Sequence, residues 1–256
     1  MIDDGEESST LPVRTERSDF SVVRYSDAVV ECDDDEVQEF GVQMASNEVR
    51  NRVTNRVVLE LVAIMLAFIV PANVIYLFMG AGEMGRWLPF GSLVSALLIL
   101  GISATSLNAA MSAFCGTRFY YFLEATFAAA IGFVLAHYYT KLFPEEIARG
   151  MEDLVGDIGL PMAIFAIGVV PGIFEEIAFR GIVQSRVKVL FGFKTGVLAS
   201  AMAFALAHGV TLGFPFHVAL GLYFAFLKER SGSLIPGMLC HFAYNTSLVV
   251  ASHTGD

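Results

Sequence analysis

Long uninterrupted apolar runs constrain this chain more than any other feature of its sequence. Runs of about 17–25 apolar residues are typical of helices that cross a membrane, because hydrocarbon offers backbone N–H and C=O groups no partners outside a helix. The sequence predicts such spans at residues 57–78, 88–107, 119–139, from 160 into a pair of glutamates, 196–212, 215–227 and 234–251. We therefore expect an all-α fold, a polytopic membrane helix bundle of about seven or eight transmembrane helices.

The charges divide the chain into two parts. Residues 1–50 contain fourteen of the 26 acidic residues and only four basic ones, so their formal charge of −10 equals that of the whole chain. This segment has too few apolar residues to offset the entropy of ordering, and it lacks the basic start and apolar core of a secretory signal peptide. We expect residues 1–50 to form an acidic, disordered tail and residues 51–256 a multi-pass membrane domain. No nucleic-acid partner is expected.

Basic residues at the ends of the predicted spans indicate an orientation, since they favour the cytoplasmic side. They precede the first span and recur on the same side of the later ones: Arg50, Arg52, Arg56, Arg118, Arg186, Lys188, Lys194, Lys228 and Arg230. We expect a cell-membrane protein with a cytoplasmic N-terminus. The acidic stretch at residues 144–157 is then expected to be an external amphipathic surface helix.

The cysteines give no sign of a metal site or a disulfide framework. Cys32, Cys115 and Cys240 are odd in number and far apart, and neither CxxC nor HExxH occurs. The first pattern would favour a thiolate zinc site, and the second would favour a zinc protease helix. We therefore expect no metal and no cofactor.

The stretch PGIFEEIAFRG, residues 171–181, places charges where an apolar span should continue. An ionisable group inside a membrane segment costs at least ~2.5 kcal/mol on insertion scales, which makes it a candidate functional residue. Glu176 and Arg180 are four residues apart and share a helical face, so they can pair. Glu175 points about 100° away and is free to do chemistry. The alternative is an ordinary ion pair at the wet end of a helix.

Two further polar motifs follow on later predicted spans. FALAH places His208, four residues after Phe204, midway along the fifth span, and HFAYN places His241 and Asn245 on one face of the seventh. Alone, the first could be a core histidine and the second a pair of interhelical hydrogen bonds. His217, at the start of the sixth span, is expected to be structural.

Together the three motifs predict a hydrolytic site. A carboxylate, two histidines and an asparagine are the groups needed to activate water and to stabilise an oxyanion. We expect Glu175 to act as the base toward water with His208 as its hydrogen-bond partner. His241 and Asn245 would donate to the oxygen of the tetrahedral intermediate.

EExxxR, FxxxH and HxxxN, in this order on apolar helices, resemble the CPBP family of CAAX proteases and bacteriocin-processing enzymes, also called the ABI family. The resemblance covers about residues 160–251 and includes the linking stretch GLYFAFLKERSGSLIPGMLCHFAYN. It implies an intramembrane glutamic endopeptidase similar to type II CAAX prenyl endopeptidases. Its catalytic residues would be Glu175, His208, His241 and Asn245, supported by Glu176, Arg180 and Phe204.

The resemblance also implies the partners. These are the lipid bilayer and a protein or peptide substrate, which in the eukaryotic and archaeal branch carries a prenyl group on a C-terminal cysteine. The acidic tail and the N-terminal half match no family motif.

Other functions stay open at this stage. Glu175, His208 and His241 could hold Zn²⁺ in a metal-dependent membrane hydrolase. A non-catalytic membrane scaffold or immunity protein could keep the same polar cluster for stability. Transport is weaker, because no paired inverted repeat is evident.

Overall fold

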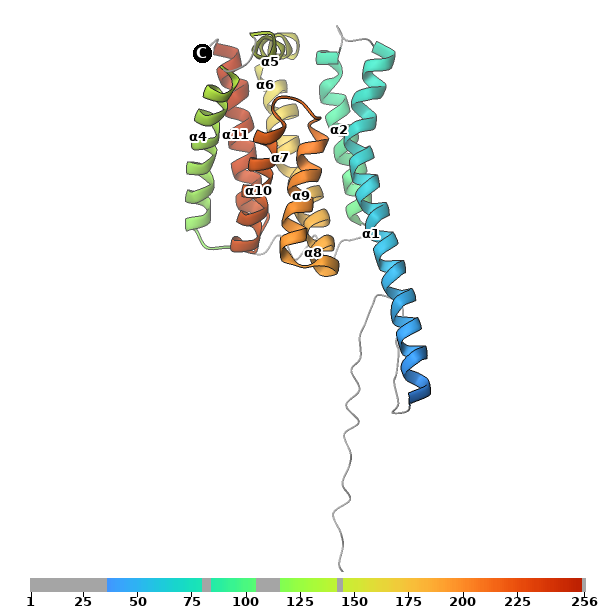
Figure 1. The fold of residues 1–256 in the computed structure, drawn as a ribbon. Coiled ribbons are helices and arrows are strands. Elements are labelled where there is room, and N and C mark those ends of the chain that lie inside the picture. Colours follow the sequence, from blue (N-terminus) through green and yellow to red (C-terminus); the bar gives the residue numbers. More distant parts are fainter. Residues whose placement is uncertain (1–35, 80–83, 105–115, 142–144, 255–256) are drawn as a thin grey trace, which may run out of the picture. The chain divides into compact units, whose positions relative to one another are not determined.

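The structure is a computed structural model that describes residues 36–79, 84–104, 116–141 and 145–254, and every regular element in these ranges is a helix. The elements are α1 (Glu36–Met79), α2 (Met84–Ala104), α4 (Tyr120–Thr140), α5 (Glu145–Ile158), α6 (Leu160–Ala163), η3 (Ile164–Val169), α7 (Val170–Glu175), η4 (Glu176–Gln184), α8 (Ser185–Phe191), α9 (Phe193–Ala207), α10 (Phe214–Ser231) and α11 (Ile235–Thr254) (Figure 1).

The chain divides into two compact units, Met1–Val53 and Thr54–Asp256, and the packing described below belongs to the second. Residues 1–35 of the tail predicted at residues 1–50 lie outside the described residues. Helix α1 begins at Glu36, within that predicted tail.

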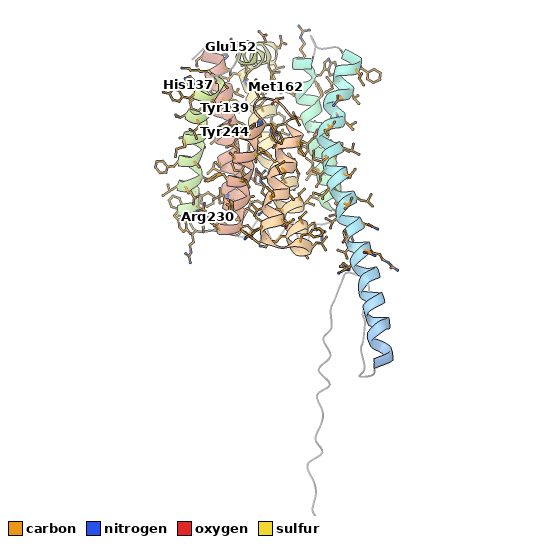
Figure 2. The ribbon with its side chains drawn as sticks, viewed as in Figure 1. His137, Tyr139, Glu152, Met162, Arg230 and Tyr244 are labelled. Carbon is orange, nitrogen blue, oxygen red and sulfur yellow. The ribbon has the colours of Figure 1, made fainter. Side chains whose placement is uncertain are left out.

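Four described helical segments are long and apolar enough to cross a membrane. They are Arg50–Ile75, Gly85–Ser103, Tyr120–Thr140 and Leu160–Phe191, and Phe193–Ala207 is a shorter apolar helix. Side chains project outward from α1, α2 and α4 (Figure 2). The exposed large apolar ones on these helices include Leu77, Leu97 and Phe127. A soluble domain rarely exposes contiguous apolar surface on this scale. The chain is therefore a multi-pass membrane protein with an all-α fold, as predicted.

The C-terminal helices form the core that holds the site. Helix α9 packs on α10 and η4, and α11 packs on α4, η3 and α7. The fully buried rings of Phe179, Phe204 and Phe224 fill the space between η4, α9 and α10. Helix α5 packs against α2 and α11 and lies crosswise at one end of the bundle (Figure 1).

Two π-helical segments interrupt the helix that runs from Leu160 to Phe191. They flank the single turn of α7 that contains Pro171 and ends at Glu175. The π-helix leaves carbonyls that side chains can reach: Ser200 Oγ donates to Phe179 O at 2.9 Å. π-Helical turns are rare and frequently mark functional sites. The sequence predicted a helical span here, but not its π-helical form.

The end of α9 differs from its prediction. The fifth span was expected to extend to residue 212 with His208 midway along it, whereas α9 ends at Ala207 and His208 caps it. Gly209 follows with φ +86°, a left-handed conformation that glycine adopts without steric cost and that stops the helix. His208 therefore lies at a helix end, next to a loop.

The close crossing of α9 and α10 depends on Gly221. A Cβ atom at this position would lie 2.9 Å from Ala201 Cα and 3.0 Å from Ala201 O, both backbone atoms that cannot move aside. We expect Gly221→Ala to lower the free energy of unfolding by about 1–3 kcal/mol, because the two helices must separate. Thermal unfolding in detergent measures this change.

Gly101, on α2, is the matched control, since a Cβ there would meet nothing within 4 Å. We expect Gly101→Ala to leave stability unchanged or to raise it by up to about 1 kcal/mol through helix propensity. Equal unfolding temperatures for the two variants would contradict the close crossing.

Candidate active site

Glu176 is the buried centre of the site. Its Oε1 atom accepts a hydrogen bond from Arg180 Nη1 at 3.0 Å and lies 3.1 Å from His241 Nδ1. All three side chains are at most 2% exposed. A carboxylate can only accept, so the Nδ1 atom of His241 carries the proton in this contact. The predicted Glu176–Arg180 pair is thus present, and Glu176 also orients a histidine from α11.

Arg180 is fully buried among aromatic rings. Its guanidinium carbon lies 4.5 Å from the ring centroid of Phe204 and 5.0 Å from that of Phe224. Its Nη2 donates to Gly221 O at 3.2 Å. A buried cation is tolerated when it is paired and hydrogen-bonded, and aromatic faces add cation–π attraction. The ion pair is therefore internal and is no surface bridge at the wet end of a helix.

Glu175 faces the other side of the same pocket. Its Oε2 atom lies 3.9 Å from His208 Nε2 and 4.0 Å from His241 Nε2. This buried oxygen has no direct hydrogen-bond partner among the described residues. Both separations are longer than a hydrogen bond, but one water molecule can bridge the Glu175 carboxylate to either imidazole. Glu175 thus points at two imidazoles from two different helices.

His208 is oriented by its own helix. Its Nδ1 atom lies 2.9 Å from Phe204 O, and since a carbonyl only accepts, Nδ1 is the donor. The Nε2 atom is then left facing Glu175. The ring is packed against Phe204, with 4.6 Å between centroids. The FxxxH spacing is therefore explained by one hydrogen bond and one ring contact.

Asn245 lies one helical turn beyond His241, but its amide points toward a different partner. Asn245 Nδ2 donates to Ile167 O, a carbonyl of η3, at 2.8 Å. An amide nitrogen carries two hydrogens, so this bond occupies one of them. The residue ties α11 to the π-helical segment and keeps one donor for another acceptor.

Gln184 was not predicted from the sequence. It is fully buried at the end of η4, and its Nε2 atom donates to Ala225 O and to Glu229 Oε1, both at 3.0 Å. It continues the four-residue spacing that begins at Glu176 and Arg180. That spacing was the available signal, because it places three polar side chains on one face of an apolar helix.

An apolar cavity of about 150 Å³ reaches the site from the side of α1 and α2. Its walls include Phe68, Ile99 and Phe174, the hydroxyl-bearing Ser95, and Glu175. Ligand pockets with mostly apolar walls and a few convergent polar groups are typical of substrate sites. The cavity therefore provides an apolar space next to the Glu175 carboxylate.

Within the described part of the chain, no group of three or more His, Cys, Asp or Glu side chains has the arrangement needed to hold a metal ion. The predicted ligand set of Glu175, His208 and His241 comes together, but as an acid between two rings at 3.9 and 4.0 Å. Two ligands of a tetrahedral zinc ion, with bonds of about 2.0–2.2 Å, lie about 3.3–3.6 Å apart, so the separations here are somewhat longer than a closed zinc site has. The zinc alternative is therefore left to the chelation test described below.

Comparisons with known proteins find similarity to a peptidase family in the segment that carries this site. Residues 157–247 match the family model described as type II CAAX prenyl endopeptidase Rce1-like. This segment extends from the end of α5 into α11 and contains all seven residues predicted for the site. The resemblance expected from the three motifs is thus confirmed for the matched segment.

A curated relative points to the same class. "Putative membrane peptidase YdiL" of Bacillus subtilis (strain 168) is 26% identical over 136 residues, which cover 47% of this chain and 56% of the relative. The chain thus spans about half the length of this relative. No solved structure matches the chain.

Proposed function

We propose that the chain is an intramembrane glutamic endopeptidase of the CPBP type, which hydrolyses peptide bonds with a water molecule activated by Glu175 and His208. The observation that carries this proposal is the position of Glu175 Oε2, which lies within 4.0 Å of the Nε2 atoms of both histidines. A general base must lie within reach of its proton directly or through one water. A water molecule held between Glu175 and either histidine would meet that condition.

The proposed reaction needs no covalent intermediate. Glu175 takes a proton from water, and the resulting hydroxide forms a bond to the carbonyl carbon of the substrate. The carbonyl electron pair moves to oxygen, which becomes an oxyanion. When the carbon–nitrogen bond breaks, the proton held by Glu175 passes to the departing amine, so the carboxylate is regenerated.

His241 and Asn245 are proposed to stabilise the oxyanion. The Nδ1 hydrogen of His241 is used on Glu176, so a hydrogen bond to the oxyanion has to come from Nε2. In the proposed reaction the ring therefore carries a hydrogen on both nitrogens. Asn245 has one amide hydrogen beyond the bond to Ile167 O. Preorganised donors of this kind are worth about 10²–10³ in turnover each. Glu176, Arg180 and Phe204 would act by holding the donors in place.

The substrate is proposed to be a membrane-associated protein or peptide, and a prenyl group near its C-terminus suits the surroundings. The apolar cavity that Glu175 helps to line supports an apolar group beside the scissile bond.

The orientation in the membrane is proposed from the charges. Basic residues on one side of the spans, including Arg186 and Lys194, favour an N-terminus in the cytoplasm.

Cleavage by detergent-purified protein tests the proposal. A panel of matched peptides, with and without a farnesylated C-terminal cysteine, would be incubated with the wild type and with His208→Ala, each with and without a strong chelator. We expect wild-type cleavage that survives chelation and a loss of about 10²–10⁴ in His208→Ala. Cleavage lost to the chelator and restored by Zn²⁺ would favour the metal-dependent alternative, and no cleavage of any peptide would favour the scaffold.

A further inference from the structure

A third histidine, His217, lies against the proposed site. It belongs to the first turn of α10, and its ring stacks on that of His208 with 4.4 Å between centroids and 25° between planes. The ring also lies 6.3 Å from that of Phe204. Nothing in the EExxxR, FxxxH or HxxxN motifs includes this residue.

Contacts from two helices surround the ring of His208. The residue caps the end of α9, and its side chain is 29% exposed, in contrast to the buried His241 at 2%. On its own helix, the bond from Nδ1 to Phe204 O and the Phe204 ring contact it. His217 adds a further ring contact from α10.

His217 is itself held by the loop between α9 and α10. A Cβ at Gly213 would lie 3.2 Å from His217 Cε1, so the ring is packed directly on the backbone there. The hydroxyl of Tyr139, on α4 (Figure 2), donates to Leu212 O at 2.7 Å. The Tyr139 ring stacks on that of Phe216. The loop between the two stacked histidines is thus hydrogen-bonded to α4.

One ring nitrogen of His217, Nδ1, is buried and makes no direct hydrogen bond within the described residues. A buried polar atom without a partner is unfavourable, so we attribute the role of His217 to its ring and not to this nitrogen. The ring packs on the backbone at Gly213 and stacks on His208.

We propose that His217 is a positioning residue, which holds the His208 imidazole by ring stacking so that Nε2 faces Glu175. This inference rests on the proposed function, since it assigns His217 a role in the same site. Small displacements of a catalytic group cost about 10²-fold per ångström. The role requires an aromatic ring and does not require a nitrogen.

Two substitutions separate stacking from other roles. We expect His217→Leu, which fills similar space without a ring, to lower kcat about tenfold or more with KM within about twofold. His217→Phe keeps the stack and removes the unpaired nitrogen, so we expect it to restore most of that loss and to unfold at no lower temperature than the wild type. The probe is a fluorogenic peptide with a farnesylated C-terminal cysteine.

Three controls accompany these variants. His253→Leu replaces an exposed histidine at the end of α11 and should match the wild type. Glu175→Gln separates a failure of the proposed function from a failure of the stacking role of His217. Full activity of Glu175→Gln would overturn the proposed function. An inactive Glu175→Gln beside a fully active His217→Leu would overturn the stacking role alone. A His217→Phe variant as slow as His217→Leu would also overturn it.

A second measurement does not depend on turnover. The five histidines would be isotopically labelled, and the ring protons of His208 observed by NMR. Stacking on an aromatic ring shifts protons that lie over its face, so His217→Leu should move the His208 signals and His217→Phe should preserve most of their shift. Unchanged His208 signals in folded His217→Leu would overturn the proposal, even if the wild type left the peptide intact.

Discussion

Replacing Glu175 with glutamine is expected to abolish peptide hydrolysis while the protein stays folded in the membrane. Glutamine has nearly the same shape but cannot take a proton from water, so we expect kcat to fall by about 10³-fold. Folding should be unaffected, because Glu175 Oε2 makes no direct hydrogen bond among the described residues. Initial rates and unfolding temperatures of the purified variant measure both parts of this prediction.

Glu152→Gln is the matched control. Glu152 is exposed on α5, at the end of the bundle (Figure 2). We expect its rate and its unfolding temperature to equal those of the wild type. Normal cleavage by Glu175→Gln, with correct folding, would mean that another group activates the water.

The second large effect is expected on stability. Arg180→Met removes the cation that pairs with Glu176 and leaves a carboxylate that is 1% exposed without its strongest partner. Breaking a buried ion pair on one side costs about 3–5 kcal/mol. Methionine preserves most of the volume, so lost packing contributes little. Thermal or denaturant unfolding in detergent measures the loss.

The expected loss has an internal check. Arg230→Met removes a cation that is about half exposed and contacts Glu124, and an exposed pair contributes about 0–1 kcal/mol. The double variant Glu176→Gln, Arg180→Met removes both buried charges and should recover part of the stability. An Arg180→Met protein that unfolds like Arg230→Met would contradict the buried ion pair.

Helix identity and the shared faces of the motifs could be predicted from sequence, because both depend on local spacing. Apolar runs of membrane length predict helices whatever their neighbours are. Glu176 and Arg180 pair as expected because four residues return to the same side of a helix. The acidic surface helix also appears where the sequence predicted it, as α5 at Glu145–Ile158.

The remaining details depend on contacts between helices, which spacing does not contain. The π-helical form of residues 176–184 is stabilised in part by Ser200 on another helix. The stack of His217 on His208 likewise needs the crossing of α9 and α10. The amide of Asn245 donates to the backbone of η3, a partner that its own helix could not reveal.

The most direct test of the central claim follows the oxygen of the attacking water. A single turnover would be carried out with enzyme in excess, in water enriched in the heavy oxygen isotope, and both product and enzyme would be analysed by mass spectrometry. If Glu175 activates water, the new carboxyl group of the product carries one heavy oxygen and the Glu175 carboxylate carries none. Heavy oxygen in Glu175 would show that its carboxylate had formed a covalent bond to the substrate, and would contradict the account.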